Sequence, residues 1–167
     1  MTNLARVSEL IAAQSPSLRL YARQWADAAT ADDVVQTALV SLLSQRKLPA
    51  EPLAWMYRAV RNAAIDSARA GTRRKKRERT VAAERGDWFE SSADNAIDAA
   101  DAEAALRELP DDAREVVVLR LWGDLGFAQV AEVLGVSVST AHERYTSALN
   151  QLRTKLEPTC PTTSKQD

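Results

Sequence analysis

The chain has 167 residues, enough for one domain or two small ones, and its formal net charge is −1. The single cysteine, Cys160, excludes a disulfide framework and a thiolate metal site, and the single histidine, His142, excludes a site built from several histidines. No nucleophile–base pair and no glycine-rich phosphate loop is evident, so we expect no catalytic residue, no metal and no cofactor. Few aromatics, five glycines and no alternating apolar run predict an all-α protein.

The apolar pattern argues against export and against membrane insertion. The first residues, MTNLARVSELIAAQ, lack the sustained apolar core of a signal peptide. The longest strongly apolar run, residues 116–119, is far too short to span a bilayer. We therefore expect a cytoplasmic protein with no membrane insertion and no small-molecule substrate.

The charges are segregated along the chain. Residues 1–79 hold 14 Lys or Arg and 7 Asp or Glu, residues 80–112 hold 2 and 10, and residues 113–167 hold 6 of each. Acids among Ala and Ser over residues 80–103 predict a flexible acidic linker, and the polar residues 158–167 predict a disordered tail. Two small helical domains, residues 1–79 and 104–157, should therefore meet different partners.

In the first domain, periodicity predicts helices over residues 4–14 and 18–28, separated by a break at residues 15–17 that contains Pro16. Thr30 and Asp33 read as a capping box that starts a third helix ending near Leu43. The exposed side of this helix is polar, with Asp32, Asp33, Gln36 and Ser41. A loop with two prolines, residues 47–52, precedes a fourth helix that should end near Arg69.

The outward face of the fourth helix suits a nucleic acid because it mixes an aromatic ring, an amide and cations. It carries Trp55, Arg58, Asn62, Asp66 and Arg69. Beyond it, seven of the eleven residues 69–79 are basic, a composition that can neutralise phosphates. The alternative is a solvated face with Trp55 turned sideways into the core.

In the second domain, we expect residues 97–109 to form a helix and a new helix to begin after Pro110. This helix should be buried through Val116, Val117, Leu119, Leu121 and Trp122. Residues 126–156 then predict a short helix, a tight turn at Gly135 and a longer helix capped by Ser137. The apolar stripe of the longer helix comprises Val138, Ala141, Tyr145, Leu149, Leu152 and Leu156. Its opposite face is polar and fits a DNA major groove, although many helical hairpins share the pattern and bind no DNA.

Three stretches in order resemble the extracytoplasmic-function group of the sigma-70 family. ADDVVQTALVSLL (31–43) is similar to the family's polymerase-docking helix, and EPLAWMYRAVRNAAIDSARAGTRRKKR (51–77) is similar to its promoter-melting helix. LPDDAREVVVLRLWGDLGFAQVAEVLGVSVSTAHERYTSALNQLR (109–153) resembles its fourth region. Together they cover some two-thirds of the chain. The resemblance implies two helical domains, sigma region 2 and sigma region 4, and no enzymatic activity.

The resemblance also implies partners and site residues. Core RNA polymerase would be bound through its clamp and flap, with region 2 contributing Asp32, Asp33, Gln36, Leu39 and Leu43. The −10 promoter element would be read and opened by Lys47, Trp55, Arg58, Arg61, Asn62, Arg69, Arg73 and Arg74. The −35 element would be read by Ser137, Ser139, Thr140, His142, Glu143, Arg144 and Ser147. An anti-sigma factor is a common further partner in the family, and the acidic linker resembles the segment that threads the polymerase cleft.

The reading helix departs from the family pattern. Ser139, Ala141, His142 and Glu143 stand where the family usually has Gly, Val, Lys and Ser, and Thr146-Ser147 replaces a common His-Arg pair. This helix has lost about two cations and gained an anion, which predicts an unusual or weak −35 preference.

Three other functions compete with a sigma factor. A helix-turn-helix regulator acting without polymerase would need a dimer to read two half-sites. A sigma-like decoy would bind polymerase or an anti-sigma factor without starting transcription. An enzyme is the weakest alternative because the sequence offers no catalytic constellation.

Overall fold

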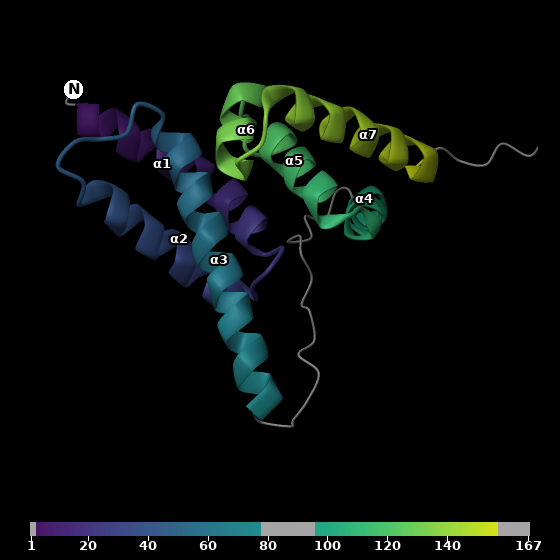
Figure 1. Ribbon diagram of the computed structural model, residues 1–167, viewed down its shortest axis with the longest axis horizontal. Coiled ribbons are helices and arrows are strands. Elements are labelled where there is room, and N and C mark those ends of the chain that lie inside the picture. The colour runs from purple at the N-terminus through teal and green to yellow at the C-terminus, as the bar shows by residue number, and fades with distance from the viewer. Residues whose placement is uncertain (1–2, 78–95, 157–167) are drawn as a thin grey trace, which may run out of the picture.

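The computed structural model describes residues 3–77 and 96–156, and these ranges contain seven helices and no strand. The acidic stretch up to residue 95 and the tail with Cys160, for which we predicted flexibility and disorder, lie outside the described residues. Figure 1 shows the first three helices on one side and the last three on the other. The helices are α1 (Asn3–Ala22), α2 (Ala28–Leu43), α3 (Pro52–Arg77), α4 (Ala96–Glu108), α5 (Asp111–Leu121), α6 (Phe127–Leu134) and α7 (Val138–Leu156).

The first helix corrects the prediction of a break at residues 15–17. It is one continuous helix, α1, that contains Pro16. A proline inside a helix removes a backbone hydrogen bond and costs about 3 kcal/mol. Ile11 and Leu18, one on each side of the proline, are both buried in the core. Burial of this continuous face offsets the local cost, so tertiary packing overrides the local signal.

Helix α2, which the sequence predicted as the third helix, starts earlier than predicted. Its N-cap is Asp27 rather than Thr30, and the backbone N–H of Thr30 donates to Asp27 Oδ1 at 2.8 Å. The buried face of α2 holds Ala31, Val34, Val35, Ala38 and Leu42. Leu43, the last residue of α2, is 43% exposed, and Val40, one turn before it, is 64% exposed. The outer side of α2 therefore presents apolar as well as acidic groups.

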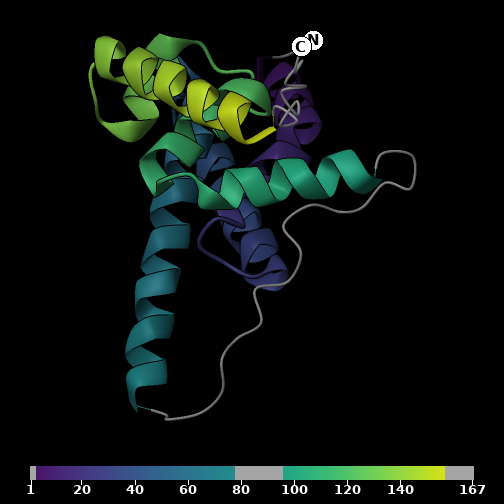
Figure 2. The same ribbon diagram turned by 90° about the vertical axis from the view of Figure 1, so that its right-hand side faces the viewer.

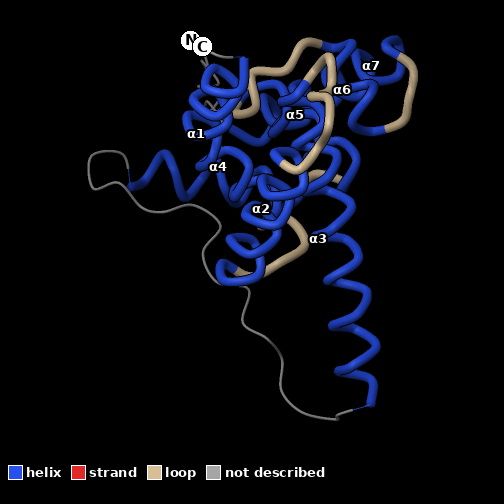
Figure 3. The backbone as a smooth tube through the Cα atoms, turned by 90° about the vertical axis from the view of Figure 1, so that its left-hand side faces the viewer, coloured by secondary structure: helices blue, strands red, loops and turns tan. Residues whose placement is uncertain are grey.

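Helix α3, which the sequence predicted as the fourth helix, is longer than predicted and is the longest in the described structure. It does not end near Arg69 but continues through Gly71 to Arg77, which corresponds to roughly 39 Å of helix. Its C-terminal half projects away from the other helices (Figures 2 and 3). Arg and Lys are good helix formers, and cations at a helix C-terminus are favoured by its dipole, so these terms outweigh the cost of one glycine.

The helix-turn-helix forms as predicted from local signals. Gly135 ends α6 with a φ of 67°, a left-handed conformation that favours glycine. The Thr140 backbone N–H donates to Ser137 Oγ at 3.0 Å, which is the expected N-cap bond.

The apolar face of α7 is rotated from the predicted stripe. Ala141 and Ala148 are fully buried, whereas Val138, Leu149 and Leu156 are between 37% and 50% exposed. α7 packs on α5, α6 and α4, and the small alanines allow close approach while the larger side chains lie at the margins. Leu121 at the end of α5, predicted to be buried, is likewise 54% exposed.

The two halves of the molecule share one hydrophobic core. α3 packs against α6 and α1 against α5, and the cluster of buried side chains runs through both halves. At one crossing point, a Cβ on Gly123 would lie 3.2 Å from the Tyr57 ring and 2.6 Å from the Leu119 carbonyl oxygen. Gly123 therefore has no room for a side chain where the halves meet.

We predict that Gly135→Ala lowers the free energy of unfolding by about 1–2 kcal/mol, because alanine is strained at positive φ. The added methyl group meets no atom within 4 Å, so backbone strain alone is measured. Chemical denaturation followed by circular dichroism provides the value. Gly71→Ala is the matched control, since it also lies in open space but within a helix, and it should not lower stability. Equal losses in both variants would contradict the argument.

Candidate nucleic-acid interface

The outward face of α3 presents most of its predicted DNA-binding groups to solvent. Arg58, Asn62 and Arg69 are exposed, and Arg73 and Arg74 are exposed on the projecting half of the helix. Trp55 is half-buried: part of its side chain packs against the core and part remains exposed to solvent. Lys47 is exposed in the loop between α2 and α3. Amide, cationic and partly exposed aromatic groups thus occur along one helix.

Arg61 occupies a different environment from the other predicted −10 residues. Its guanidinium faces α5, where Nε donates to Glu115 Oε2 at 2.7 Å and Nη2 donates to Glu115 Oε1 at 3.2 Å. The Arg61 side chain is 27% exposed and that of Glu115 only 6%. The hydrogen bond to Glu115 raises the pKa of Arg61 further above its already high value. Arg61 is therefore a bidentate partner of a buried carboxylate.

Glu115 also accepts a hydrogen bond from Tyr21 Oη at 2.9 Å, so three donors converge on one carboxylate. Burial, and then the negative charge of Glu115, raises the pKa of Tyr21 well above its ordinary value. The sequence analysis missed this group. Glu115 shares an i, i+4, i+7 face with Leu119 and Trp122, and an acid in such an apolar stripe was the signal available.

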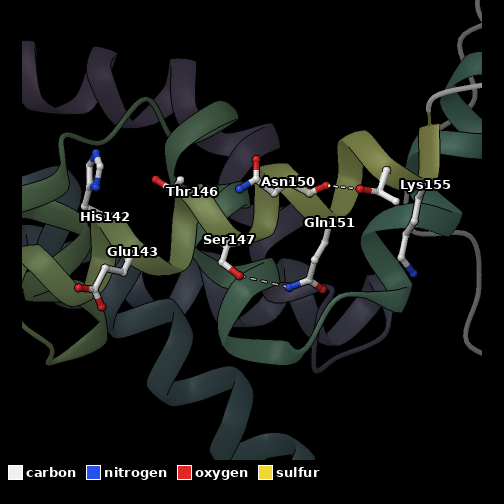
Figure 4. A pocket seen from close by; sticks show the side chains of 8 residues that line it. His142, Glu143, Thr146, Ser147, Asn150, Gln151 and Lys155 are labelled. Carbon is white, nitrogen blue, oxygen red and sulfur yellow. Dashed lines mark hydrogen bonds between the residues drawn. The ribbon is translucent and has the colours of Figure 1, made fainter.

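The outward face of α7 forms a shallow groove lined by short polar side chains (Figure 4). Its lining comprises His142, Glu143, Thr146, Ser147, Asn150, Gln151, Thr154 and Lys155. Ser139, which precedes the groove, is also exposed. Opposite charges are thus confined to its two ends, while amides and hydroxyls occupy the middle.

Three of the predicted −35 residues cap α7 or join it to α5 through polar contacts. Arg144 Nε lies 3.5 Å from Asp112 Oδ2 and the Arg144 side chain is 33% exposed. Ser137 caps α7 and its hydroxyl donates to Thr140 Oγ1 at 2.8 Å. These three residues position the helix, which leaves Ser139, His142, Glu143 and Ser147 at its exposed surface.

An aromatic cluster holds α6 against the start of α7. The Phe127 ring lies 5.0 Å from His142 and 5.4 Å from Tyr145, centroid to centroid. The Arg120 guanidinium lies 4.5 Å from the Phe127 centroid and also hydrogen-bonds to the Leu125 carbonyl oxygen. Cation–π and edge contacts of this kind fix the angle between the two helices.

The predicted polymerase-binding residues lie on one exposed side of α2. Asp33, Gln36 and Leu43 are exposed, and Leu39 is half-buried. Asp32 pairs with Arg19 at 2.8 Å, but both side chains are about half exposed, so the pair contributes little stability. Acidic and apolar groups are therefore free to meet a protein partner on this side.

A helix-turn-helix, a cationic projecting helix and an exposed side of α2 that is both acidic and apolar fit a protein that contacts both DNA and another protein. Comparison with known proteins gives the family. The family described as Sigma-70 region 2 matches residues 10–74, and Sigma-70, region 4 matches residues 100–152. The chain belongs to the sigma-70 family, in its extracytoplasmic-function group, and is a promoter-specificity subunit of RNA polymerase. Sigma factors are in general not enzymes.

Two known proteins are similar to the chain over most of its length. RNA polymerase sigma factor SigV of Bacillus subtilis (strain 168) is 27% identical over 127 residues, which is 74% of each chain. The sigma factor RpoE of Bartonella quintana, solved in complex with the anti-sigma factor NepR, aligns over 93% of this chain and 97% of its own with a TM-score of 0.71. At 21% identity, the RpoE match shows the fold alone. Within the described ranges, no helix is long and apolar enough to cross a bilayer.

The tyrosines of the core give a pH-dependent prediction. Burial raises the pKa of Tyr57, as it does for Tyr21, so both remain protonated in the native state when an unfolded tyrosine would ionise near pH ~10. The unfolded state then binds fewer protons. We therefore predict that the free energy of unfolding is unaffected by these groups below pH ~10 and falls above it by about 1.4 kcal/mol per pH unit for each tyrosine.

Denaturation at stepped pH measures this slope, and absorbance of tyrosinate follows ionisation. Tyr21→Phe and Tyr57→Phe should each reduce the slope. Reversible ionisation of all three tyrosines near pH ~10 with native circular dichroism would contradict the burial argument.

Proposed function

We propose that this sigma subunit opens the −10 element with the outward face of α3 and reads the −35 element with the outward face of α7, while α2 holds core polymerase. The observation that carries the proposal is the exposed row Arg58, Asn62 and Arg69 on a helix that continues beyond the body of the protein. This row joins base-binding chemistry to phosphate-binding chemistry on one rigid element.

At the −10 element, DNA opening requires capture of unstacked bases. The Asn62 amide can pair with a base edge, Arg58 can stack on or bind a base, and the partly exposed ring of Trp55 offers a stacking edge. Arg69, Arg73 and Arg74 on the projecting half, with Lys47 in the adjacent loop, neutralise phosphates and release counterions. Base capture and backbone binding are thus assigned to successive parts of α3.

At the −35 element, the exposed groups of α7 are adapted to a few base edges rather than to phosphates. Glu143 can accept a hydrogen bond from a cytosine amine, and Ser139, His142 and Ser147 can contact base edges on either side. Ser137, Thr140 and Arg144 support this surface through the N-cap and the Asp112 ion pair. Because cations are scarce here, discrimination should exceed affinity.

Polymerase binding is assigned to the outer side of α2. Asp32, Asp33 and Gln36 provide the polar rim, while Leu39, Val40 and Leu43 provide apolar area. The clamp is the expected partner for this side, and the flap is the expected partner for the region around α7. The chain would act in the cytoplasm, where bacterial polymerase lies, and an anti-sigma factor is a further expected partner, as NepR is for RpoE.

Run-off transcription tests the proposal directly. Purified chain and bacterial core polymerase are combined with a library of upstream fragments from the source genome. Discrete start sites that require the chain are the expected result, and alignment of their upstream sequences would identify what His142 and Glu143 contact. Co-elution with polymerase without transcripts would favour the decoy, and loss of both would favour a regulator that acts without polymerase.

Two substitutions should separate the assigned roles. Arg58→Ala removes an exposed cation from α3 and should lower promoter opening, read by permanganate footprinting, by at least about tenfold while polymerase still co-elutes. Asp33→Arg reverses a charge on α2 and should weaken co-elution with polymerase. The new arginine would repel a polymerase surface that complements the negative charge of Asp33.

Each variant is the control for the other, since both residues are exposed and neither should alter folding. Arg58→Ala protein that loses polymerase binding to the same degree as opening would contradict its role in DNA contact. Unchanged co-elution of the Asp33→Arg protein would remove this side of α2 from the polymerase interface.

A further inference from the structure

Helix α3 contains a single acidic residue, Asp66, among eight basic residues. Asp66 is exposed and lies on the outward face of the helix, one turn after Asn62 and one turn before Arg69. A carboxylate within a surface that binds phosphates repels those phosphates, so it weakens the attraction of the helix for any DNA. Phosphate binding therefore gives no reason for an acid at this position, whereas contact with a base would.

The Asp66 carboxylate has no hydrogen bond or ion pair with any of the described residues. Arg69 follows it at i+3, a spacing at which opposite charges on a helix commonly pair. A pair of this spacing does form on α5, where Arg114 Nη1 lies 3.3 Å from Asp111 Oδ1. Both oxygens of Asp66 are thus free to meet a ligand that approaches the outward face of α3.

The surroundings of Asp66 leave room for a planar base. Ala59 and Ala70 lie within about 40° of Asp66 around the helix axis, one on the turns before it and one on the turn after it. Ala70 is exposed and Ala59 is half-buried, and neither side chain extends beyond a methyl group. A base that lies against these alanines would present its edge to Asp66.

The hydrogen-bonding capacity of a carboxylate distinguishes the four bases. An ionised carboxylate only accepts hydrogen bonds, and it does so through two oxygens. In an opened strand, the Watson–Crick edge of an unstacked base is accessible. Guanine presents two adjacent donors on this edge, N1–H and N2–H, whereas adenine, cytosine and thymine each place an acceptor beside a donor. Guanine alone can therefore bind both oxygens without repulsion.

We propose that Asp66 is a specificity-determining residue of the −10 surface, which selects a guanine in the opened strand by accepting two hydrogen bonds from its Watson–Crick edge. This inference rests on the proposed function, in which the outward face of α3 captures unstacked bases, and it adds the identity of one base. Asn62 stays available for a neighbouring base and Arg69 for the adjoining phosphate. A strand without guanine is penalised, because the unpaired carboxylate then lies beside phosphates.

The test measures binding of the full chain to labelled single-stranded DNA by fluorescence anisotropy at low salt. Oligothymidines of about 12 nucleotides carry one central guanine, inosine, adenine or cytosine, or thymine throughout. The parent protein should bind the guanine oligonucleotide about tenfold more tightly than the all-thymine one, as expected for a two-fold hydrogen bond to a base. Inosine lacks the N2 amine of guanine, so it should lose most of this gain.

Asp66→Asn separates recognition from charge. An amide offers one donor and one acceptor, which matches the edges of adenine and cytosine, so the preference should move from guanine to these bases. Asp66→Ala should lose the guanine preference and bind the all-thymine oligonucleotide more tightly than the parent, because a repulsive charge is gone. Glu9→Gln is the matched control: it removes one negative charge from an exposed position on α1 and should keep the guanine preference.

The possible outcomes separate this inference from the proposed function. Equal binding of guanine and thymine oligonucleotides by the parent would overturn the guanine assignment and leave the proposed function standing. A preference for cytosine, or a guanine preference that persists in Asp66→Asn, would overturn it too. Parent protein that binds none of the oligonucleotides would refute both. Guanine selection by a chain that starts no transcripts with polymerase would refute the proposed function alone.

Discussion

The convergence of Tyr21 and Arg61 on the Glu115 carboxylate sets how the two halves of the protein meet. The three residues come from three helices that are far apart in the sequence, and each donor fixes a different direction of approach. Hydrogen bonds to a buried charge tolerate little misalignment because an unsatisfied ion is costly in a low dielectric. The rotation of α5 against α1 and α3 is therefore specified by this group, while the surrounding apolar contacts supply area. The helix-turn-helix follows α5 and takes its position from it.

α3 combines two roles because only part of its length lies in the core. Along its first half, Met56, Tyr57, Val60 and Ala64 are fully buried and fix the rotation of the helix. The outward groups then follow from helical geometry alone, since Arg58 and Asn62 are one turn apart on the opposite side. The second half projects from the body and needs no apolar stripe, so its sequence is free to be cationic. The buried first half of α3 thus positions the charged second half, which needs no apolar contacts of its own.

Local signals predicted most of this fold, and long-range contacts account for the corrections. The turn at Gly135 and the cap at Ser137 depend on neighbouring residues, and both are found as predicted. Pro16 inside α1 is tolerated because residues on both sides of it are buried. Burial of this kind depends on the rest of the fold and cannot be read from the residues next to the proline. Glu115 was missed for the same reason: its partners lie 54 and 94 residues away, and helical periodicity carries no information on such pairs. The roles assigned to individual DNA-binding residues remain predictions, since exposure permits contact but does not identify the partner.

The distribution of charge indicates how affinity and specificity are divided in the proposed function. Attraction to DNA depends on phosphate neutralisation, and the exposed cations needed for it are concentrated on the projecting half of α3. The groove of α7 carries one anion, Glu143, one cation, Lys155, which is paired with Glu108, and several neutral side chains. It therefore adds little attraction but can reject base pairs that leave Glu143 unpaired. The cationic half of α3 is useful only when it is directed to promoters, because the same charges bind any DNA.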